Sequence, residues 1–124
     1  MGISIADLFN DPRTMGELPD ADVAGQEGIP GEGPFMRMYL KFQGEQIRTA
    51  RFETYNCPYA VACGSWVTRW VEGRTIAQAS VLETEDVSRI LGGLPLAKEH
   101  CASLAVKSLR AGLQEWQELR KEEA

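Results

Sequence analysis

The sequence predicts an α+β domain in which a small antiparallel β-sheet packs against several helices, with a long helix at the C-terminus. Hydrophobic residues alternate over residues 35–55, as they do in half-buried strands, and the period becomes helical after Cys57. A second long stretch with helical spacing runs from Glu99 to Arg120. A chain of 124 residues is long enough to bury one core, so we predict a single domain over residues 1–124.

The N-terminal part, residues 1–34, is predicted to hold a short helix and then a glycine-rich loop. Residues 4–9 place apolar side chains on one side, and Ser4 can cap the first turn. Residues 10–12, Asn-Asp-Pro, end the helix because the residue before a proline avoids the helical region. Over residues 16–34, five glycines and three prolines interrupt any periodicity. We expect a loop there, which is either a plain surface loop or a functional one.

Residues 35–56 are predicted to form a β-hairpin. Residues 35–42 place Met and Leu side chains on one face and Arg and Lys on the other. Residues 43–45 supply the turn, and residues 47–55 form the returning strand. Ile47 is out of phase with the apolar face of that strand, which indicates a bulge or a late strand start.

The remaining part, residues 57–124, is predicted to be helical. One amphipathic helix follows Cys57 and ends at Gly73. Residues 75–80 and 84–91 are predicted as two short helices, the second capped by Thr84. The last helix covers about residues 99–120, and we expect the charged tail after it to be frayed.

Composition excludes several classes of function. The net charge of −5 argues against nucleic-acid binding, which needs a basic face to neutralise phosphates. No apolar run approaches the roughly 18 residues of a membrane-spanning helix, and the N-terminus lacks the pattern of a secretory signal. We therefore expect a cytoplasmic protein without a membrane partner. Phosphate-binding and nucleophile-elbow motifs are also absent from the sequence.

The candidate chemistry lies in three cysteines and one histidine. Cys57 falls between a strand and a helix, and Cys101 falls in the first turn of the last helix, next to His100. Backbone N–H groups at a helix start favour a thiolate, so both cysteines suit a reactive or ligating role. Cys63 lies on an apolar stripe, where a core role is more common. The odd number of cysteines does not suggest a disulfide framework.

His100 and Cys101 allow three interpretations: two metal ligands, a nucleophile beside a base, or two ordinary residues of a helix start. Adjacent helical residues diverge by about 100°, so we expect a direct His100–Cys101 contact to be unfavourable and a Cys/His hydrolase to be the weakest interpretation. Glu32, in the glycine-rich loop, can approach the same place from another part of the chain. The two cysteines, Cys57 and Cys101, are far apart in the sequence, so they lack the closely spaced CxxC pair of a zinc knuckle.

Four segments resemble the NifU/IscU-type iron–sulfur cluster assembly scaffolds, in the same order along the chain. They are NDPRTMG at residues 10–16, GIPGEGP at 28–34, RTARFETYNCPYAVACGSWVTRWVEGRT at 48–75 and LPLAKEHCASLAVKSLRAGL at 94–113. The resemblance covers nearly the whole chain and implies the α+β fold of that family. In three positions the chain departs from the family pattern: Glu32 replaces the first cluster cysteine, Pro34 replaces an aspartate, and Leu96 replaces the second proline of the chaperone-recognition stretch.

The resemblance implies roles for individual residues. Cys57 and Cys101 match the second and third cluster-binding cysteines, and His100 matches the histidine that completes a zinc or cluster site. Cys101 would also accept persulfide sulfur from a cysteine desulfurase. With Glu32 as a fourth ligand, the set suits tetrahedral zinc and is a poorer match for an iron–sulfur cluster, in which thiolates predominate.

Three functional hypotheses follow. The leading one is a scaffold-like protein, not an enzyme, that binds zinc or an iron–sulfur species, receives sulfur from a cysteine desulfurase and serves an iron–sulfur acceptor or carrier protein. The second is a divergent family member that has lost the cluster and acts as a protein-interaction or regulatory module. The third is a sulfur relay through Cys101 activated by zinc.

Overall fold

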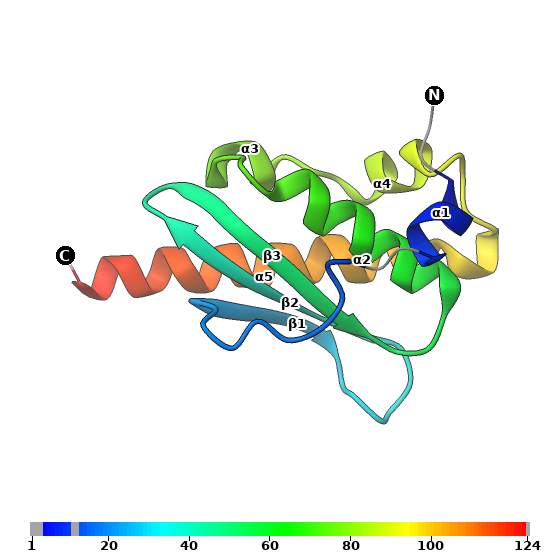
Figure 1. The fold of residues 1–124 in the computed structure, drawn as a ribbon, viewed down its shortest axis with the longest axis horizontal. Coiled ribbons are helices and arrows are strands. Elements are labelled where there is room, and N and C mark those ends of the chain that lie inside the picture. Colours follow the sequence, from blue (N-terminus) through cyan, green and yellow to red (C-terminus); the bar gives the residue numbers. More distant parts are fainter. Residues whose placement is uncertain (1–3, 11–12, 124) are drawn as a thin grey trace.

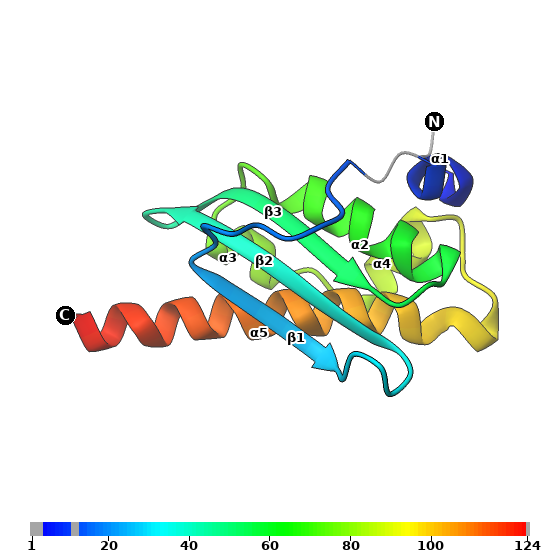
Figure 2. The same ribbon diagram turned by 60° about the horizontal axis from the view of Figure 1, so that its bottom comes forward.

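The structure is a computed structural model that describes residues 4–10 and 13–123. A three-stranded antiparallel sheet, in the order β1-β2-β3, forms one layer, and α2 and α5 cover one face of it (Figure 1; Figure 2). In chain order the elements are α1 (Ile5–Asn10), β1 (Val23–Gly28), β2 (Phe35–Gln43), β3 (Gln46–Thr54), α2 (Pro58–Val71), α3 (Ile76–Ser80), α4 (Thr84–Ile90), a 3-10 turn η1 (Leu96–Lys98) and α5 (Glu99–Glu123). The predicted α+β class is confirmed.

The edge strand β1 lies inside the region that the sequence predicted to be a loop, so that prediction was wrong for Val23–Gly28. The strand has the sequence VAGQEG, with only one β-branched residue, which explains why its propensity signal is weak. Gly25 allows β1 to lie directly against α5: a Cβ at that position would collide with the Ser108 carbonyl oxygen and the Gly112 backbone nitrogen. This glycine therefore marks a close approach of a strand to a helix.

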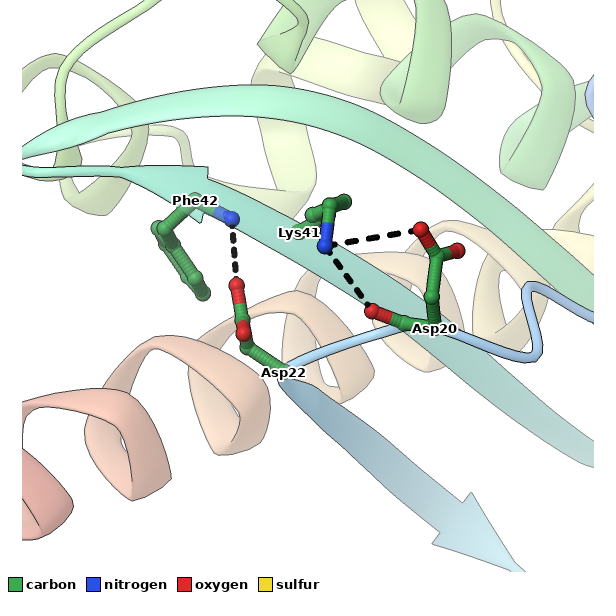
Figure 3. Close-up of polar contacts among 4 residues, drawn as sticks. All are labelled: Asp20, Asp22, Lys41 and Phe42. Carbon is green, nitrogen blue, oxygen red and sulfur yellow. Dashed lines mark hydrogen bonds and ion pairs between the residues drawn. The ribbon is translucent and has the colours of Figure 1, made fainter.

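Two aspartates fix the start of β1 against β2 (Figure 3). The Asp22 carboxylate accepts a hydrogen bond from the Phe42 backbone N–H at 2.7 Å. Lys41 Nζ donates to the Asp20 carbonyl at 3.2 Å and lies 3.4 Å from the Asp20 carboxylate. These contacts join the incoming chain to β2 at the point where the β2–β3 register shifts, between Lys41 and Phe42. The bulge expected from the phase of Ile47 is thus confirmed, and it allows Ile47 to be buried.

The predicted hairpin is present, with β2 burying the alternating face that the sequence indicated. Before β1, the N-terminal segment pairs with β3 through a parallel bridge between Met15 and Phe52. The buried Thr68 hydroxyl of α2 donates to the Thr14 hydroxyl at 2.8 Å and so fixes this segment to the helix layer. The first helix is also confirmed: the Ser4 hydroxyl accepts from the Asp7 backbone N–H at 3.1 Å. The predicted helix stop at residues 11–12 lies outside the described residues.

Two helix boundaries differ from the prediction. The N-cap of α4 is Glu83, whose backbone N–H donates to the Asp86 carboxylate, so the assignment of Thr84 as the cap was wrong. The last helix continues to Glu123, three residues beyond the expected end at Arg120, and the expected fraying of the charged tail stays a prediction. At this end, Arg120 forms an exposed ion pair of 2.6 Å with the Glu45 carboxylate of the β2–β3 turn. In the part of the chain that the structure describes, no helix has the length and apolar character to cross a bilayer.

Candidate functional site

Three connections gather at one end of the sheet: the β1–β2 loop, the β3–α2 junction and the start of α5 (Figure 1). They carry Glu32, Cys57 and the His100–Cys101 pair, respectively. The sheet and the long helix therefore bring residues that are distant in sequence to the same end of the molecule. Within it, the structure places Cys57, His100 and Cys101 around one further side chain, that of Tyr55.

Cys57 is the N-cap residue of α2 in an extended conformation, and Pro58 follows it at the first helical position. Only 4% of Cys57 is exposed. Burial raises the pKa of its thiol, but hydrogen bonds from the Ala60 backbone N–H, the Tyr55 hydroxyl and the Tyr59 backbone N–H outweigh burial and hold the pKa below its ordinary value. The helix start thus favours a thiolate at Cys57, as the sequence predicted.

Cys101 lies in the first turn of α5 and has no exposed surface. Burial raises the pKa of its thiol above the ordinary value, and the hydrogen bond from Tyr55 only partly offsets this. The neighbouring Cys57 raises the pKa further, through its charge and through a hydrogen bond with the Cys101 thiol. At the same pH, Cys57 is therefore the better thiolate of the pair and Cys101 the better thiol.

Tyr55 joins these groups. Its hydroxyl oxygen lies 2.9 Å from His100 Nε2 and 3.6 Å from Cys101 Sγ, and its hydroxyl also interacts with the Cys57 thiol. Burial raises the pKa of the Tyr55 phenol well above its ordinary value, so that Tyr55 remains a protonated donor. The sequence prediction missed this residue, because alternation along a strand indicates only which face is buried. Its one available signal was its position two residues before Cys57.

His100 and Cys101 are closer than the helical divergence of adjacent residues suggested. Cys101 Sγ lies 3.7 Å from His100 Nε2, because both side chains turn toward the Tyr55 hydroxyl. The expectation that a direct contact would be unfavourable was therefore wrong. His100 is exposed, whereas Cys101 is buried.

Cys63 is fully buried in the core, as its place on the apolar stripe predicted. Burial raises the pKa of its thiol strongly, and the charges of Cys101 and Cys57 act in the same direction. All three cysteines are free thiols. Cys63 is thus near the other two thiols but belongs to the packing of α2 against the sheet.

Glu32 does not join the other residues. It is exposed in a turn of the β1–β2 loop, in which its backbone N–H donates to the Ile29 carbonyl at 3.0 Å. Among residues 4–10 and 13–123, no group of three or more His, Cys, Asp or Glu side chains is arranged to hold a metal ion. The four-residue ligand set therefore stays a prediction. By their chemistry, thiols and an imidazole are the kinds of donor that iron–sulfur species and zinc accept.

Comparison with known sequences identifies the family. The "NifU-like N terminal domain" family matches residues 3–123, which is almost the whole chain. The chain belongs to the NifU-like N-terminal domain family. Its similarity to curated NifU-like relatives is consistent with this assignment. The iron-sulfur cluster assembly scaffold protein IscU 1 of Archaeoglobus fulgidus is 37% identical over 109 residues, which are 88% of this chain and 71% of that protein.

A second NifU-like relative covers both chains more fully. The iron-sulfur cluster assembly scaffold protein IscU of Escherichia coli (strain K12) is 32% identical over 121 residues, 94% of each chain. Among solved structures, a SUF-system iron-sulfur cluster assembly scaffold protein from Fervidobacterium islandicum AW-1 has a TM-score of 0.72 at 19% identity, covering 88% of this chain and 93% of that one. A NifU-like N-terminal protein from Brucella abortus has a TM-score of 0.64 at 15% identity, covering 94% and 92%. These structures support the NifU-like fold.

Proposed function

We propose that this NifU-like chain is an iron–sulfur cluster assembly scaffold. The observation that supports it best is the convergence of Cys57, Cys101 and His100 on Tyr55 at one end of the fold. The named scaffold relatives, at 32–37% identity over most of the chain, support the same function. The alternative of an interaction module without metal is weaker, because it gives no reason for two thiols and an imidazole to meet.

The cluster is the cargo of this scaffold, not a resident group. Cys57 and Cys101 would supply thiolates and His100 an imidazole nitrogen, a combination that iron–sulfur clusters accept. Glu32 would be the fourth ligand once the β1–β2 loop turns toward Cys57. Zinc is the competing occupant, since the same four donors suit a tetrahedral site.

Cys101 would receive sulfur as a persulfide from a cysteine desulfurase, and the assembled cluster would pass to an acceptor or carrier protein. Because Cys101 has no exposed surface, sulfur delivery would require the side chains around it to move. We place this activity in the cytoplasm. The chain would act by binding and transfer and not as an enzyme in its own right.

Anaerobic reconstitution with ferrous iron and sulfide tests the proposal. We expect visible-region absorbance from the parent protein, and its loss in Cys57→Ser and in Cys101→Ser. The matched control is Cys63→Ser, which removes a thiol of the core and should keep the absorbance. Elemental analysis of protein purified without oxygen distinguishes iron from zinc. Absence of both the absorbance and stoichiometric zinc in the parent protein would exclude the scaffold function.

A further inference from the structure

We propose that Tyr55 and an incoming metal ion compete for one nitrogen of His100, so that the Tyr55 hydroxyl controls how tightly the scaffold binds metal. This inference rests on the proposed function, because it takes His100 and Cys101 as ligands of the cargo. It adds to that function a residue that is not itself a ligand but governs access to one.

The Tyr55 hydroxyl is closer to the imidazole than to the thiol. Its oxygen lies 2.9 Å from His100 Nε2 and 3.6 Å from Cys101 Sγ. A phenol has one hydrogen to donate, and the free nitrogen of a neutral imidazole is a better acceptor than sulfur. We therefore assign the hydrogen of Tyr55 to Nε2, and the proton of the neutral imidazole to the other ring nitrogen, Nδ1. The Cys101 thiol is then able to donate to the Tyr55 oxygen.

The nitrogen that accepts from Tyr55 is also the one that faces the thiol. Cys101 Sγ lies 3.7 Å from His100 Nε2. In a tetrahedral zinc site, with a Zn–S distance of about 2.3 Å and a Zn–N distance of about 2.0 Å, a sulfur and a nitrogen ligand lie about 3.5 Å apart. The two atoms thus have nearly the spacing of two ligands on one ion, and Nε2 is the nitrogen that would bind it.

A metal ion and a hydrogen-bond donor exclude each other at this nitrogen. Nε2 of a neutral imidazole has one lone pair, which either accepts a hydrogen or binds a metal. A metal that binds His100 must therefore displace the Tyr55 hydroxyl. The free energy of the lost hydrogen bond is subtracted from the free energy of metal binding, which weakens binding by about twofold to tenfold.

The surrounding backbone holds Tyr55 in this position. The preceding residue, Thr54, ends β3, and its hydroxyl donates to the Phe35 carbonyl at 2.6 Å. The Tyr55 carbonyl accepts a hydrogen bond from the Cys57 backbone N–H at 2.8 Å, and the Tyr55 ring packs against the core. Because the backbone is tied on both sides of Tyr55, release of the imidazole requires a rotation of side chains and leaves the strand in place.

NMR tests the hydrogen bond, because His100 is the one histidine of the chain. In the full chain, treated with a chelator and kept reduced, nitrogen-15 spectra show which nitrogen of the neutral imidazole carries the proton. We expect Nδ1–H in the parent and a shift of the population toward Nε2–H in Tyr55→Phe. The matched control is Tyr39→Phe, which removes a β2 hydroxyl that bonds to Glu53. It should match the parent. A proton on Nε2 in the parent would overturn the proposal.

Zinc binding tests the competition. Zinc(II) alone is titrated into each protein against a competing chelator, and circular dichroism verifies that each variant is folded. We expect Tyr55→Phe to bind zinc about twofold to tenfold more tightly than the parent, and Tyr39→Phe to bind it as the parent does. Equal or weaker binding by Tyr55→Phe would overturn the proposal and leave the scaffold function intact. So would a parent protein that binds no zinc but forms a cluster on reconstitution. If the parent binds neither, the proposed function itself fails.

A third variant, His100→Ala, shows whether Tyr55 acts through the imidazole. This variant keeps both thiols but lacks the nitrogen for which Tyr55 competes. Tyr55→Phe should therefore produce no gain in zinc affinity in the His100→Ala background. An equal gain in that background would show that the hydroxyl acts on the thiols or on packing, and would overturn the proposal.

Discussion

The Tyr55 hydroxyl oxygen lies 2.9 Å from His100 Nε2, and this contact links the end of β3 to the start of α5. The same hydroxyl interacts with both Cys57 and Cys101. One protonated phenol thus faces an imidazole and two thiols. Since one O–H group donates to only one acceptor at a time, the state of any one of these groups affects the others.

Tyr55→Phe should raise the pKa of the Cys57 thiol. Its pKa is held low in part by the hydrogen bond from Tyr55, so the loss of that hydrogen bond should move the pKa of the thiol upward. The measurement is the ultraviolet absorbance of the thiolate against pH, in a Cys63→Ser, Cys101→Ser background in which Cys57 is the one remaining cysteine. The matched control is Tyr59→Phe, which removes a hydroxyl but keeps the Tyr59 backbone N–H that also lowers this pKa. An unchanged titration curve for Tyr55→Phe would show that the Tyr55 hydroxyl does not affect the pKa of Cys57.

Glu32→Cys should prolong the life of a reconstituted iron–sulfur cluster by several-fold. The change would add a third thiolate, the ligand that such clusters prefer. Gly31 and Gly33 flank the position with φ values of +87° and +100°, which only glycine adopts readily, and the substitution leaves both glycines in place. The decay of visible absorbance in the presence of a chelator measures the effect. Ile29→Cys, in the same loop, is the control, and an equal gain from it would show that any added thiol is sufficient.

Sequence patterns predicted most of the fold, because its strongest elements have clear periodicity. The alternation of β2, the amphipathic spacing of α5 and the phase of Ile47 are consequences of burial on one face. The helix α2, in contrast, is buried on all sides over residues 60–68. The strand β1 was missed because it depends on a tertiary contact. The absence of a side chain at Gly25 allows the backbone of α5 to approach closely. In the sequence alone, a glycine at this place indicates a loop. The end of α5 was placed three residues too early, and the contact of Arg120 with Glu45, which is distant in sequence, gives no local signal.

The candidate site was predicted only in part, for a related reason. Cys57, His100 and Cys101 stand out by residue type, and their positions at helix starts were readable from the sequence. The role of Tyr55 depends on how the end of β3 faces α5, which no local pattern specifies. The same tertiary contact turns His100 toward Cys101, against the divergence that an isolated helix would impose.

Thr68→Val should destabilise the fold by about 1–3 kcal/mol, because it leaves the buried Thr14 hydroxyl without the hydrogen bond between them, 2.8 Å long. Thr14→Val should lower the free energy of unfolding by a similar amount. If the two hydroxyls act mainly on each other, the double variant should cost clearly less than the sum of the single variants. Urea unfolding of the four proteins measures this coupling. Strict additivity would show that the contact does not couple the N-terminal segment to α2.

Cys63 should make the fold less stable as the pH rises above the ordinary cysteine pKa of about 8.5. Burial raises the pKa of its thiol in the folded chain, so below that pH both states hold the proton and the folded state loses nothing. Above it, the unfolded chain releases the proton while the folded chain retains it. The free energy of unfolding then falls by about 1.4 kcal/mol per pH unit from this one residue.

Urea unfolding at several pH values between about 7.5 and 9.5 tests this linkage on both sides of the unfolded-state pKa. Cys63→Ala and Cys63→Ser should both lower stability at the acidic end of this range, since each disturbs a packed position. Neither alanine nor serine ionises in this pH range. The free energy of unfolding of each variant should therefore fall less steeply with pH than that of the parent. Cys101, whose pKa is also raised, mainly by burial, should keep a residual slope in both variants. Parallel curves for the parent and the two variants would show that the Cys63 thiol titrates alike in the folded and unfolded chains.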